Sequence, residues 1–486
     1  MNKIVATIRR LPLSVALAAG LVFALGQPPF ELWWLALPAL ICPFVLMQDL
    51  SGSRQSFWLG WCFGFGYFFL SLFWITEPFL VDAARHGWMA PFAAFFMAGG
   101  LALFWGGAFA LATTMRVGSL GLIALWTLAE VLRSLVFTGF PWGLIGYSLA
   151  PLPLVQWAAI VGSFGLTAMA LALAALASRS RLGVLSALLI AAGLWVGGVI
   201  IQPKAQDLTG RPVVRVVQPN IPQDKKWDPE YRRLFFDRLL ALSAAEPAPD
   251  VTLWPETALT VLLHQADPFL EAMSAVSPGG DLIFGVQRLV DGQFYNSAVQ
   301  MDAEGHLTAS YDKHHLVPFG EYMPLSGLFD QLGISGLVGF PAGFSAGVGP
   351  QVIKTAAGIA LPLICYEAVF ARDLRGTVRP DYVVHLTNDG WFGTGGGPAQ
   401  HLMQARLRAI EFGLPVVRSA NTGISAMIDP AGRILDHLPI AAEGYLDAAL
   451  PRAVSPTFYA RVADWPVIIF CLMALGLAGI RRRSAR

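Results

Sequence analysis

The chain has 486 residues, of which 55% are hydrophobic and only 13% are charged, a composition that excludes an ordinary soluble protein. The formal net charge of +1 gives no reason to expect a nucleic-acid partner, and no basic run lies outside the segments that flank apolar stretches. A membrane protein is therefore expected.

Apolar stretches dominate the first part of the chain and return near its end. Each is about 15 to 25 residues long, close to the length that a helix needs to cross about 30 Å of hydrocarbon. A stretch of about 260 residues with soluble composition precedes the last one and is long enough to bury its own core. We predict a seven-helix transmembrane region at 1–205, a large domain at 206–460, and a C-terminal transmembrane helix with a tail at 461–486. The eight stretches lie at 11–26, 31–47, 56–76, 89–113, 118–139, 153–177, 183–201 and 463–480.

The positive charges that flank these stretches predict their orientation, because Lys and Arg near helix ends are retained in the cytoplasm. With the N-terminus inside, the outer short loops hold only Arg85 and Arg133. A cleaved export signal at the N-terminus is disfavoured, because its removal would spoil this asymmetry. Both termini are therefore expected in the cytoplasm and the large domain outside. The cytoplasmic side would hold Lys3, Arg9, Arg10, Arg54, Arg116, Arg179, Arg181, Arg481, Arg482, Arg483 and Arg486.

After Pro203 the pattern changes to short strand-like segments separated by polar and glycine-containing turns. Helical stretches at Asp228–Ala245 and Gln400–Phe412 interleave with them. This alternation predicts an α/β layered domain. The expected strands are Val213–Gln218, Val251–Trp254, Leu282–Val286, Ser297–Met301, Ile359–Cys365, Tyr382–Thr387, Val416–Ser419 and Ile424–Ile428.

Cys365 is the one cysteine of the large domain, since Cys42, Cys62 and Cys471 fall inside apolar stretches. A lone cysteine in a compartment that favours disulfides is either buried and inert or a reactive thiol. Its sequence neighbours decide between these two interpretations.

Three segments place a chemical group where an apolar strand ends. Glu256 follows Leu253-Trp254-Pro255, Lys313 opens the turn-rich string after Tyr311-Asp312, and Cys365 closes Leu363-Ile364. Each alone would be an ordinary exposed or structural residue, but together they can converge on one point. A thiol with a pKa of about 8.5 needs a base or a positive charge beside it. Glu256 is suited to be that base, and Lys313 to stabilise an oxyanion.

The order Glu, Lys, Cys and the strings WPET, KHHLVPFGEYMP and ICYE carry a resemblance. The chain resembles the carbon–nitrogen hydrolase (nitrilase) superfamily, and the longer strings resemble its membrane-bound branch, the apolipoprotein N-acyltransferases. The likeness covers essentially the whole chain. It implies a bundle of eight transmembrane helices and an extracytoplasmic nitrilase-like domain built as an α-β-β-α sandwich.

The resemblance also implies supporting residues at Glu321, Tyr366, Glu367 and Trp227. Glu321 and Glu367 could position Lys313 or relay protons, or they could simply pair with it. Trp227 could contact acyl chains or belong to the core.

A glycine-rich segment at 388–398 carries two adjacent aromatic residues, Trp391 and Phe392. No lysine follows as a phosphate-binding loop requires, so a nucleotide site is disfavoured. We expect a substrate-gating or lipid-facing loop, with an ordinary surface turn as the alternative.

Three further features of the sequence could indicate other kinds of site. The string Gly343–Gly347 fits a serine nucleophile elbow, but no buried strand leads into it. The adjacent His314 and His315 lack partners that would complete a zinc pattern, so no metal is expected. In the fifth stretch, Glu130 and Arg133 share a helical face and are expected to pair, with a transport pathway as the alternative.

The resemblance implies an acyltransferase of the bacterial inner membrane with its catalytic domain on the periplasmic side. A phospholipid would donate an acyl chain to Cys365, and the N-terminal amine of a diacylglyceryl-modified apolipoprotein would accept it. The expected protein is a monomer in the lipid bilayer and needs no cofactor. Two alternatives are a membrane-tethered amidase or nitrilase, and a transporter or receptor with an inactive nitrilase-like domain.

Overall fold

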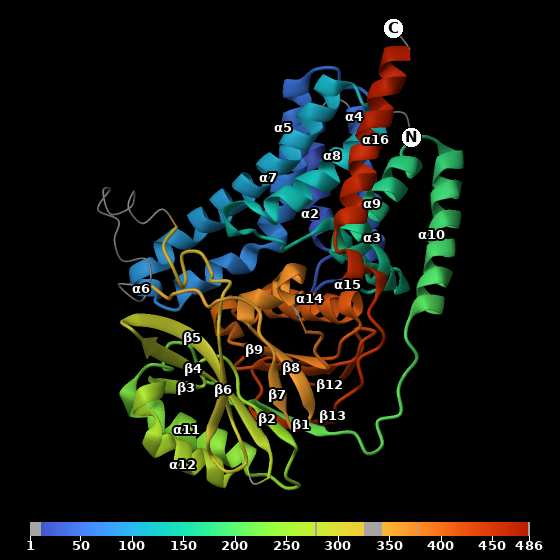
Figure 1. Cartoon of the computed structure of the whole chain (residues 1–486). Helices are drawn as coiled ribbons and strands as arrows, with labels where there is room; N and C mark the ends of the chain where they lie inside the picture. Colours follow the sequence, from blue (N-terminus) through green and yellow to red (C-terminus); the bar gives the residue numbers. More distant parts are fainter. Residues whose placement is uncertain (1–10, 278, 325–342, 377, 485–486) are drawn as a thin grey trace. The chain divides into compact units, whose positions relative to one another are not determined.

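The computed structural model describes residues 11–277, 279–324, 343–376 and 378–484 (Figure 1). The chain forms two compact units. We call Met1–Gln202, Gly395–Met403 and Pro456–Arg486 the helical unit, and Pro203–Thr394 with Gln404–Ser455 the sheet unit. Of the charges used to predict orientation, Lys3, Arg9, Arg10 and Arg486 lie outside the described residues.

The helical unit consists of helices joined by short connections. Close backbone approach holds α2 against α5: a Cβ on Gly20 would lie 2.0 Å from the Phe63 carbonyl oxygen, and one on Gly66 would lie 2.4 Å from that of Leu17. Small residues at such crossings are typical of membrane helix pairs. The main helices are α2 (Pro12–Ala24), α3 (Trp33–Ala39), α4 (Ile41–Met47), α5 (Ser53–Ser71), α6 (Ala83–His86), α7 (Ala90–Met115), α8 (Gly118–Arg133), α9 (Ala158–Ala177), α10 (Arg181–Ile201), α15 (Phe458–Val462) and α16 (Trp465–Ser484). The 3₁₀ segments are η1 (Phe73–Leu80), η2 (Gly87–Met89), η3 (Val136–Thr138), η4 (Ile145–Leu149) and η5 (Pro153–Trp157).

The C-terminal helix α16 packs back onto α8 and α9. Cys471, Ala474 and Val467 of α16 form one buried apolar cluster with Ala124 and Ala168. The two ends of the sequence thus contribute to a single helical unit.

Fewer helices reach spanning length than the eight expected. Among the described residues, three are long and apolar enough to cross a membrane: Ala83–Met115, Pro153–Ala177 and Arg181–Ile201. A fourth is obtained if Ser53–Ser71 and Phe73–Leu80, which meet at a 46° bend, count as one span. Shorter apolar helices occupy Pro12–Ala24, Trp33–Met47 and Trp465–Ile480.

The charged pair of α8 lies at the centre of a buried polar network. Arg133 and Glu130 form an ion pair of 2.9 Å with side chains that are 0% exposed. Trp105 Nε1 donates to Glu130 Oε1 at 2.8 Å, and the Ile145 N–H donates to Oε2 at 3.2 Å. The guanidinium also donates to three carbonyls of the irregular segment that follows, those of Phe140, Trp142 and Gly143. These contacts support the expected structural pairing.

The first half of α14 (Gly396–Phe412) groups with the helical unit. The buried Gln400 amide fixes it there: Oε1 accepts from the indole N–H groups of Trp74 and Trp142, at 3.1 and 2.7 Å. Its Nε2 donates to the carbonyls of Pro28 and Ser71. Every hydrogen-bonding atom of this amide therefore has a partner.

The sheet unit begins with a seven-stranded sheet of order β13-β1-β2-β4-β5-β6, with β3 also paired to β4. Strands β1, β2 and β4 are parallel, whereas β13, β5 and β6 pair antiparallel to their neighbours. The strands are β1 (Val213–Gln218), β2 (Val251–Leu253), β3 (Leu259–Leu262), β4 (Asp281–Val290), β5 (Gln293–Met301), β6 (Leu307–Asp312) and β13 (Gly444–Ala449).

A second sheet has six strands in the order β12-β11-β10-β9-β8-β7. Its central strands β8, β9 and β10 are parallel, so their carboxyl ends share one edge. The strands are β7 (Ile353–Thr355), β8 (Gly358–Ile364), β9 (Tyr382–Thr387), β10 (Val416–Ala420), β11 (Ser425–Ile428) and β12 (Ile434–Leu438).

The two sheets face each other across one apolar core. Val216, Leu253 and Ile283 of the first sheet cluster there with Ile364 and Leu386 of the second. The outer face of the first sheet is covered by α11 (Pro229–Ser243) and α12 (Asp267–Ala275), as Figure 1 shows. On the second sheet, Arg406 and Arg408 of α14 donate to the carbonyls of Gly432 and Val369. The α/β layered domain expected from the sequence is confirmed.

Candidate active site

Glu256 lies three residues beyond the end of β2, in a loop that packs tightly on β4. Both carboxylate oxygens are held: Oε1 accepts from Asn296 Nδ2 at 2.8 Å, and Oε2 accepts from the Asn388 N–H at 2.9 Å. Gly285 makes the close approach possible, because a Cβ there would lie 2.3 Å from the Thr257 nitrogen and 2.5 Å from the Pro255 oxygen. The carboxylate is therefore fixed by one strand and one loop, and its own backbone packs against a second strand.

Lys313 follows β6 and is buried between two carboxylates. Its Nζ lies 2.8 Å from Glu321 Oε2 and 3.5 Å from Glu256 Oε1. Asn296 also donates to Glu321 at 3.0 Å and so bridges the two acids. Burial opposes the charge on Lys313, but the negative charges of Glu321 and Glu256 outweigh it and raise the pKa of the ammonium. The site thus holds a permanent cation.

Cys365 begins the 3₁₀ turn η7 (Cys365–Val369), directly after β8. Its φ of 50° lies in the left-handed region, which a residue with a Cβ adopts only at a cost. Hydrogen bonds hold this turn: the Ile364 N–H donates to Glu367 Oε2 at 2.7 Å, the Phe370 N–H donates to the Glu367 carbonyl at 3.1 Å, and His385 Nε2 lies 3.1 Å from the Cys365 carbonyl oxygen. The strained turn presents the thiol at the carboxyl edge of the sheet.

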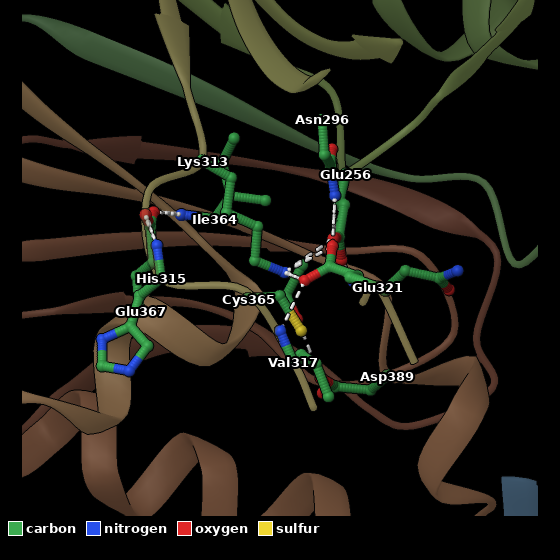
Figure 2. Close-up of polar contacts among 12 residues, drawn as sticks. Glu256, Asn296, Lys313, His315, Val317, Glu321, Ile364, Cys365, Glu367 and Asp389 are labelled. Atoms are coloured by element: carbon green, nitrogen blue, oxygen red, sulfur yellow. Dashed lines mark hydrogen bonds and ion pairs between the residues drawn. The ribbon is translucent and has the colours of Figure 1, made fainter. Parts of the chain in front are cut away.

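Figure 2 shows the Cys365 side chain, the Lys313 ammonium and the carboxylates of Glu256 and Glu321 directed toward one another. Burial first, and the charge of Glu256 second, raise the pKa of the Cys365 thiol. Lys313 and a hydrogen bond with Thr387 act in the opposite direction but do not cancel the increase. The thiol is therefore protonated at neutral pH and needs a base when it reacts.

The contacts of Glu367 among the described residues do not include Lys313, so the alternative of a direct pair finds no support, and its role in positioning stays a prediction. Its carboxylate points instead toward backbone groups on both sides of the site, as Figure 2 shows for Ile364 and His315. Oε1 accepts from the N–H groups of His314 and His315, at 2.8 and 3.2 Å, and from the Tyr311 hydroxyl at 2.8 Å. The fully buried Glu367 thereby ties the segment after Lys313 to the strand end before Cys365.

The His314 ring lies between two acids, with Nδ1 2.7 Å from Glu367 Oε1 and Nε2 3.5 Å from Asp373 Oδ1. Burial opposes its charge, but hydrogen bonds to Asp373 and Glu367 raise the pKa of His314 to about 9. His314, His315 and Asp373 bring three potential ligand atoms within 4.8 Å of one another. The geometry is that of an imidazolium bridging two carboxylates, with the Arg372 guanidinium 3.4 Å from His315 Nε2. A cation beside these groups does not fit a metal site.

The aromatic residues expected at the site fall into different surroundings. Trp227 and Trp391 are 44% and 41% exposed, so neither belongs to the core. Phe392 is half-buried and packs against the core between the sheets, and its expected substrate-gating or lipid-facing role stays a prediction. Tyr366 is buried, and its ring meets those of His315 and Phe370 edge-on.

The structure adds residues that the sequence did not single out. Asn296 bridges the two acids from the middle of β5, and Lys226 donates to the Glu256 carbonyl at 3.1 Å. Asn388 belongs to the glycine-rich segment, where its backbone rather than its side chain reaches Glu256. None of the three stands in a pattern that separates it from neighbouring polar residues.

Two family models match the chain. Residues 19–176 match the apolipoprotein N-acyltransferase N-terminal domain, and residues 213–457 match the carbon-nitrogen hydrolase model. The second match covers both sheets and every residue of the cluster around Cys365.

Curated relatives are similar over nearly the whole length. An apolipoprotein N-acyltransferase of Rhodopseudomonas palustris is 38% identical over 96% of this chain and 95% of its own length. One from Bradyrhizobium diazoefficiens is 39% identical over 97% of this chain and 95% of its own length. Among solved structures, an amidase from Nesterenkonia sp. shows 20% identity and a TM-score of 0.39 over 53% of this chain and 95% of its own.

Proposed function

Since this chain belongs to the apolipoprotein N-acyltransferase family, we propose that it moves an acyl chain from a phospholipid, through a thioester on Cys365, to the N-terminal amine of a diacylglyceryl-modified apolipoprotein. The observation that carries the proposal is the cluster in which Lys313 is shared by Glu256 and Glu321 and directed toward Cys365. The domain is nitrilase-like and the enzyme is an acyltransferase.

In the first half-reaction Glu256 takes the proton of the Cys365 thiol as sulfur attacks the ester carbonyl of the phospholipid. Lys313 stabilises the negative oxygen of the tetrahedral intermediate, because a fixed charge in a water-poor site acts strongly on developing charge. The carbon–oxygen ester bond then breaks. Glu256 returns the proton to the leaving oxygen, which gives a lysophospholipid and an acyl thioester.

In the second half-reaction the neutral α-amine of the lipoprotein attacks the thioester carbonyl. Glu256 accepts a proton from the attacking nitrogen, and Lys313 again stabilises the oxyanion. The carbon–sulfur bond breaks, and the departing thiolate recovers a proton from Glu256. The amide product leaves, and the Cys365 thiol and the Glu256 carboxylate are back in their starting states. No step of this sequence uses a cofactor.

Glu321, Asn296 and Glu367 serve this chemistry as positioning residues. Glu321 and Asn296 fix the Lys313 ammonium and the Glu256 carboxylate relative to each other. Glu367 holds the backbone beside Lys313 and Cys365 by accepting from the N–H groups of His314 and Ile364. A displacement of about 1 Å in such a site can cost on the order of a hundredfold in rate.

Three exposed aromatic side chains are proposed to contact the acyl chains of the substrates. Trp227, Phe319 and Trp391 are 44%, 54% and 41% exposed, and each lies in a loop that also carries a residue of the site. The respective neighbours are Lys226, Glu321 and Asn388. Large exposed apolar groups around a polar centre are typical of lipid or protein contact surfaces.

We also propose the full arrangement in the membrane that the sequence predicts. Eight spans, both termini in the cytoplasm and a periplasmic catalytic domain would place a monomer in the bacterial inner membrane. The apolar helices and the lopsided charge distribution support this arrangement. A substrate that resides in the bilayer explains why the catalytic domain is joined to so many apolar helices.

A transfer assay tests the function. The purified protein in phospholipid vesicles is mixed with a synthetic diacylglyceryl lipopeptide, and the lipopeptide mass is followed. We expect a gain of one acyl chain on the α-amine with wild type and with Cys62→Ala, and none with Cys365→Ala. Turnover of a small amide without lipid, with no lipopeptide product, would contradict the proposal and favour a tethered amidase.

A further inference from the structure

Lys226 is a buried cation next to the site that the mechanism above does not use. It lies in the turn before α11 and is 2% exposed, and its Nζ donates to the Glu256 carbonyl at 3.1 Å. Among the described residues, no carboxylate lies within 4 Å of this ammonium. Its neighbour Lys225 is exposed and lies over the Tyr231 ring, 5.1 Å from the centroid.

The charges of the site are unequal without Lys226. Glu256 and Glu321 are two acids, and within the described part of the chain the cation that forms ion pairs with them is Lys313. The Lys226 ammonium interacts electrostatically with the Glu256 carboxylate and with the Cys365 thiol. It therefore supplies the positive charge that brings the cluster to neutrality.

An ammonium buried without a carboxylate partner is costly, because nothing fully replaces its lost hydration. Burial accordingly lowers the pKa of Lys226 to about 8, against the opposing effect of Glu256 and Cys365. The groups that offset this cost by their charge are the Glu256 carboxylate and the Cys365 thiol. Both groups belong to the reaction site, so Lys226 faces the negative charge that the reaction uses.

We propose that Lys226 is a positioning residue that fixes the Glu256 loop through its carbonyl and stabilises the negative charge that passes among Glu256, Cys365 and the acyl oxyanion. This inference rests on the proposed function, because it assigns a role in the same acyl-transfer site. Lys226 acts through Glu256 and at a distance on Cys365.

If the charge of Lys226 assists the reaction, the rate of Cys365 acylation should decrease at alkaline pH, where Lys226 loses its proton. Lys226 faces Glu256 and Cys365, which in turn face Lys313, Glu321 and Asp389. Lys313 keeps its proton in the alkaline range because its pKa is raised, so Lys226 is the cation that is lost first. Above a pH of about 8 the site loses one positive charge, and formation of the thiolate and oxyanion becomes slower.

The test compares Lys226→Met, Lys226→Arg and the matched surface control Lys225→Met in single-turnover acylation by phospholipid between pH 6 and 10. Intact-protein mass spectrometry measures the adduct. We expect the wild-type rate and the Lys225→Met rate to fall above about pH 8. In Lys226→Arg the fall should move to higher pH. In Lys226→Met the rate should be lower on the order of tenfold at pH 7 and show no fall.

The proposal is overturned if Lys226→Met matches wild type at every pH, or if folded Lys226→Arg keeps the alkaline fall where wild type has it. Alkylation of Cys365 by iodoacetamide measures the reactivity of the thiol without any lipid. It therefore tests the role of Lys226 even if the proposed acyl transfer does not occur. If wild type forms no acyl adduct, the proposed function fails. The role of Lys226 is then decided by whether Lys226→Met slows Cys365 alkylation at pH 7 and Lys225→Met does not.

Discussion

Two of the buried ionic clusters among the described residues use similar residue types differently. In the helical unit, Glu130 and Arg133 form one closed pair, and the guanidinium also binds three carbonyls. In the sheet unit, Lys313 is shared by Glu256 and Glu321 and lies beside a protonated thiol. The first cluster is saturated with hydrogen bonds, whereas the second contains an acid, a lysine and a thiol among which a proton can move.

The difference shows how structural and reactive charges can be told apart. All donors of the Arg133 guanidinium are already bound to Glu130 and to backbone carbonyls. Removal of this arginine is therefore expected to destabilise the surrounding segment. The compact charge of Lys313 lies beside two acids and a thiol, where it can lower the energy of a negatively charged reaction intermediate. The following substitutions test this contrast.

Arg133→Met should give the largest loss of stability. It leaves Glu130 buried without its cation and removes donors from three carbonyls, and breaking a buried pair in this way costs about 3–5 kcal/mol. Thermal unfolding in detergent measures the change, with the exposed Arg54→Met as control. An Arg133→Met protein as stable as the control would mean that the network is not structural.

Lys313→Met should lower activity more than stability, because Asn296 still donates to both acids and their side chains keep some exposure, 9% and 12%. Loss of an oxyanion-stabilising charge lowers the rate by on the order of a hundredfold or more. Acyl transfer to the lipopeptide measures the effect, and Lys354→Met, at an exposed position of β7, is the matched control. If Lys313→Met lowers the unfolding temperature as much as Arg133→Met does, the proposed contrast between the two clusters fails.

Gly285→Ala tests whether the reactive cluster depends on the position of the Glu256 loop. The added Cβ would meet backbone atoms of Thr257 and Pro255, at 2.3 and 2.5 Å, so the loop must move. We expect a loss of activity on the order of tenfold to a hundredfold. Gly444→Ala is the control, because its Cβ would meet only Leu438 at an ordinary 3.6 Å. Equal activity of the two variants would show that the loop is not held as described.

The smallest expected effect concerns pH and the His314 imidazolium. Its pKa is raised from 6.5 to about 9 in the folded protein. The resulting stabilisation is complete below about pH 6.5 and is lost as the pH rises through about 9. Lys226 acts in the opposite sense, since its lowered pKa makes stability rise with pH between about 8 and 10.5.

Unfolding of His314→Gln and wild type, measured from pH 6 to 9.5, isolates the imidazolium because Lys226 is common to both proteins. The difference in stability between them should shrink as the pH increases. The exposed His437→Gln is the control and should follow wild type. A constant difference between His314→Gln and wild type would rule out a titrating imidazolium.

Much of the sheet unit could be predicted, because short apolar runs bounded by polar or turn residues are a clear sequence signal for buried strands. The limits of β1 and β9 were predicted correctly as Val213–Gln218 and Tyr382–Thr387. Strand β12 was missed because four of its five residues are exposed, and β13 because Gly444 and Asp447 weaken its apolar pattern. Edge strands take their conformation from pairing with neighbours, which a local pattern does not contain.

The same reasoning applies to the site. Glu256, Lys313 and Cys365 follow strand ends, so sequence position predicted that they would meet. Lys225 and Lys226 are adjacent identical residues, and only the turn of the folded chain decides which one is buried. The partners of Glu367 depend likewise on the junction of two loops that are about 50 residues apart in sequence.

Intact-protein mass spectrometry of wild type and Cys365→Ala, after incubation with a phospholipid of defined acyl chains and no acceptor, tests the central claim most directly. We predict a mass gain of one acyl chain on wild type alone, and its release when a lipopeptide amine is added. A folded, lipid-bound wild-type protein without an adduct, or an equal adduct on Cys365→Ala, would contradict a thioester on Cys365.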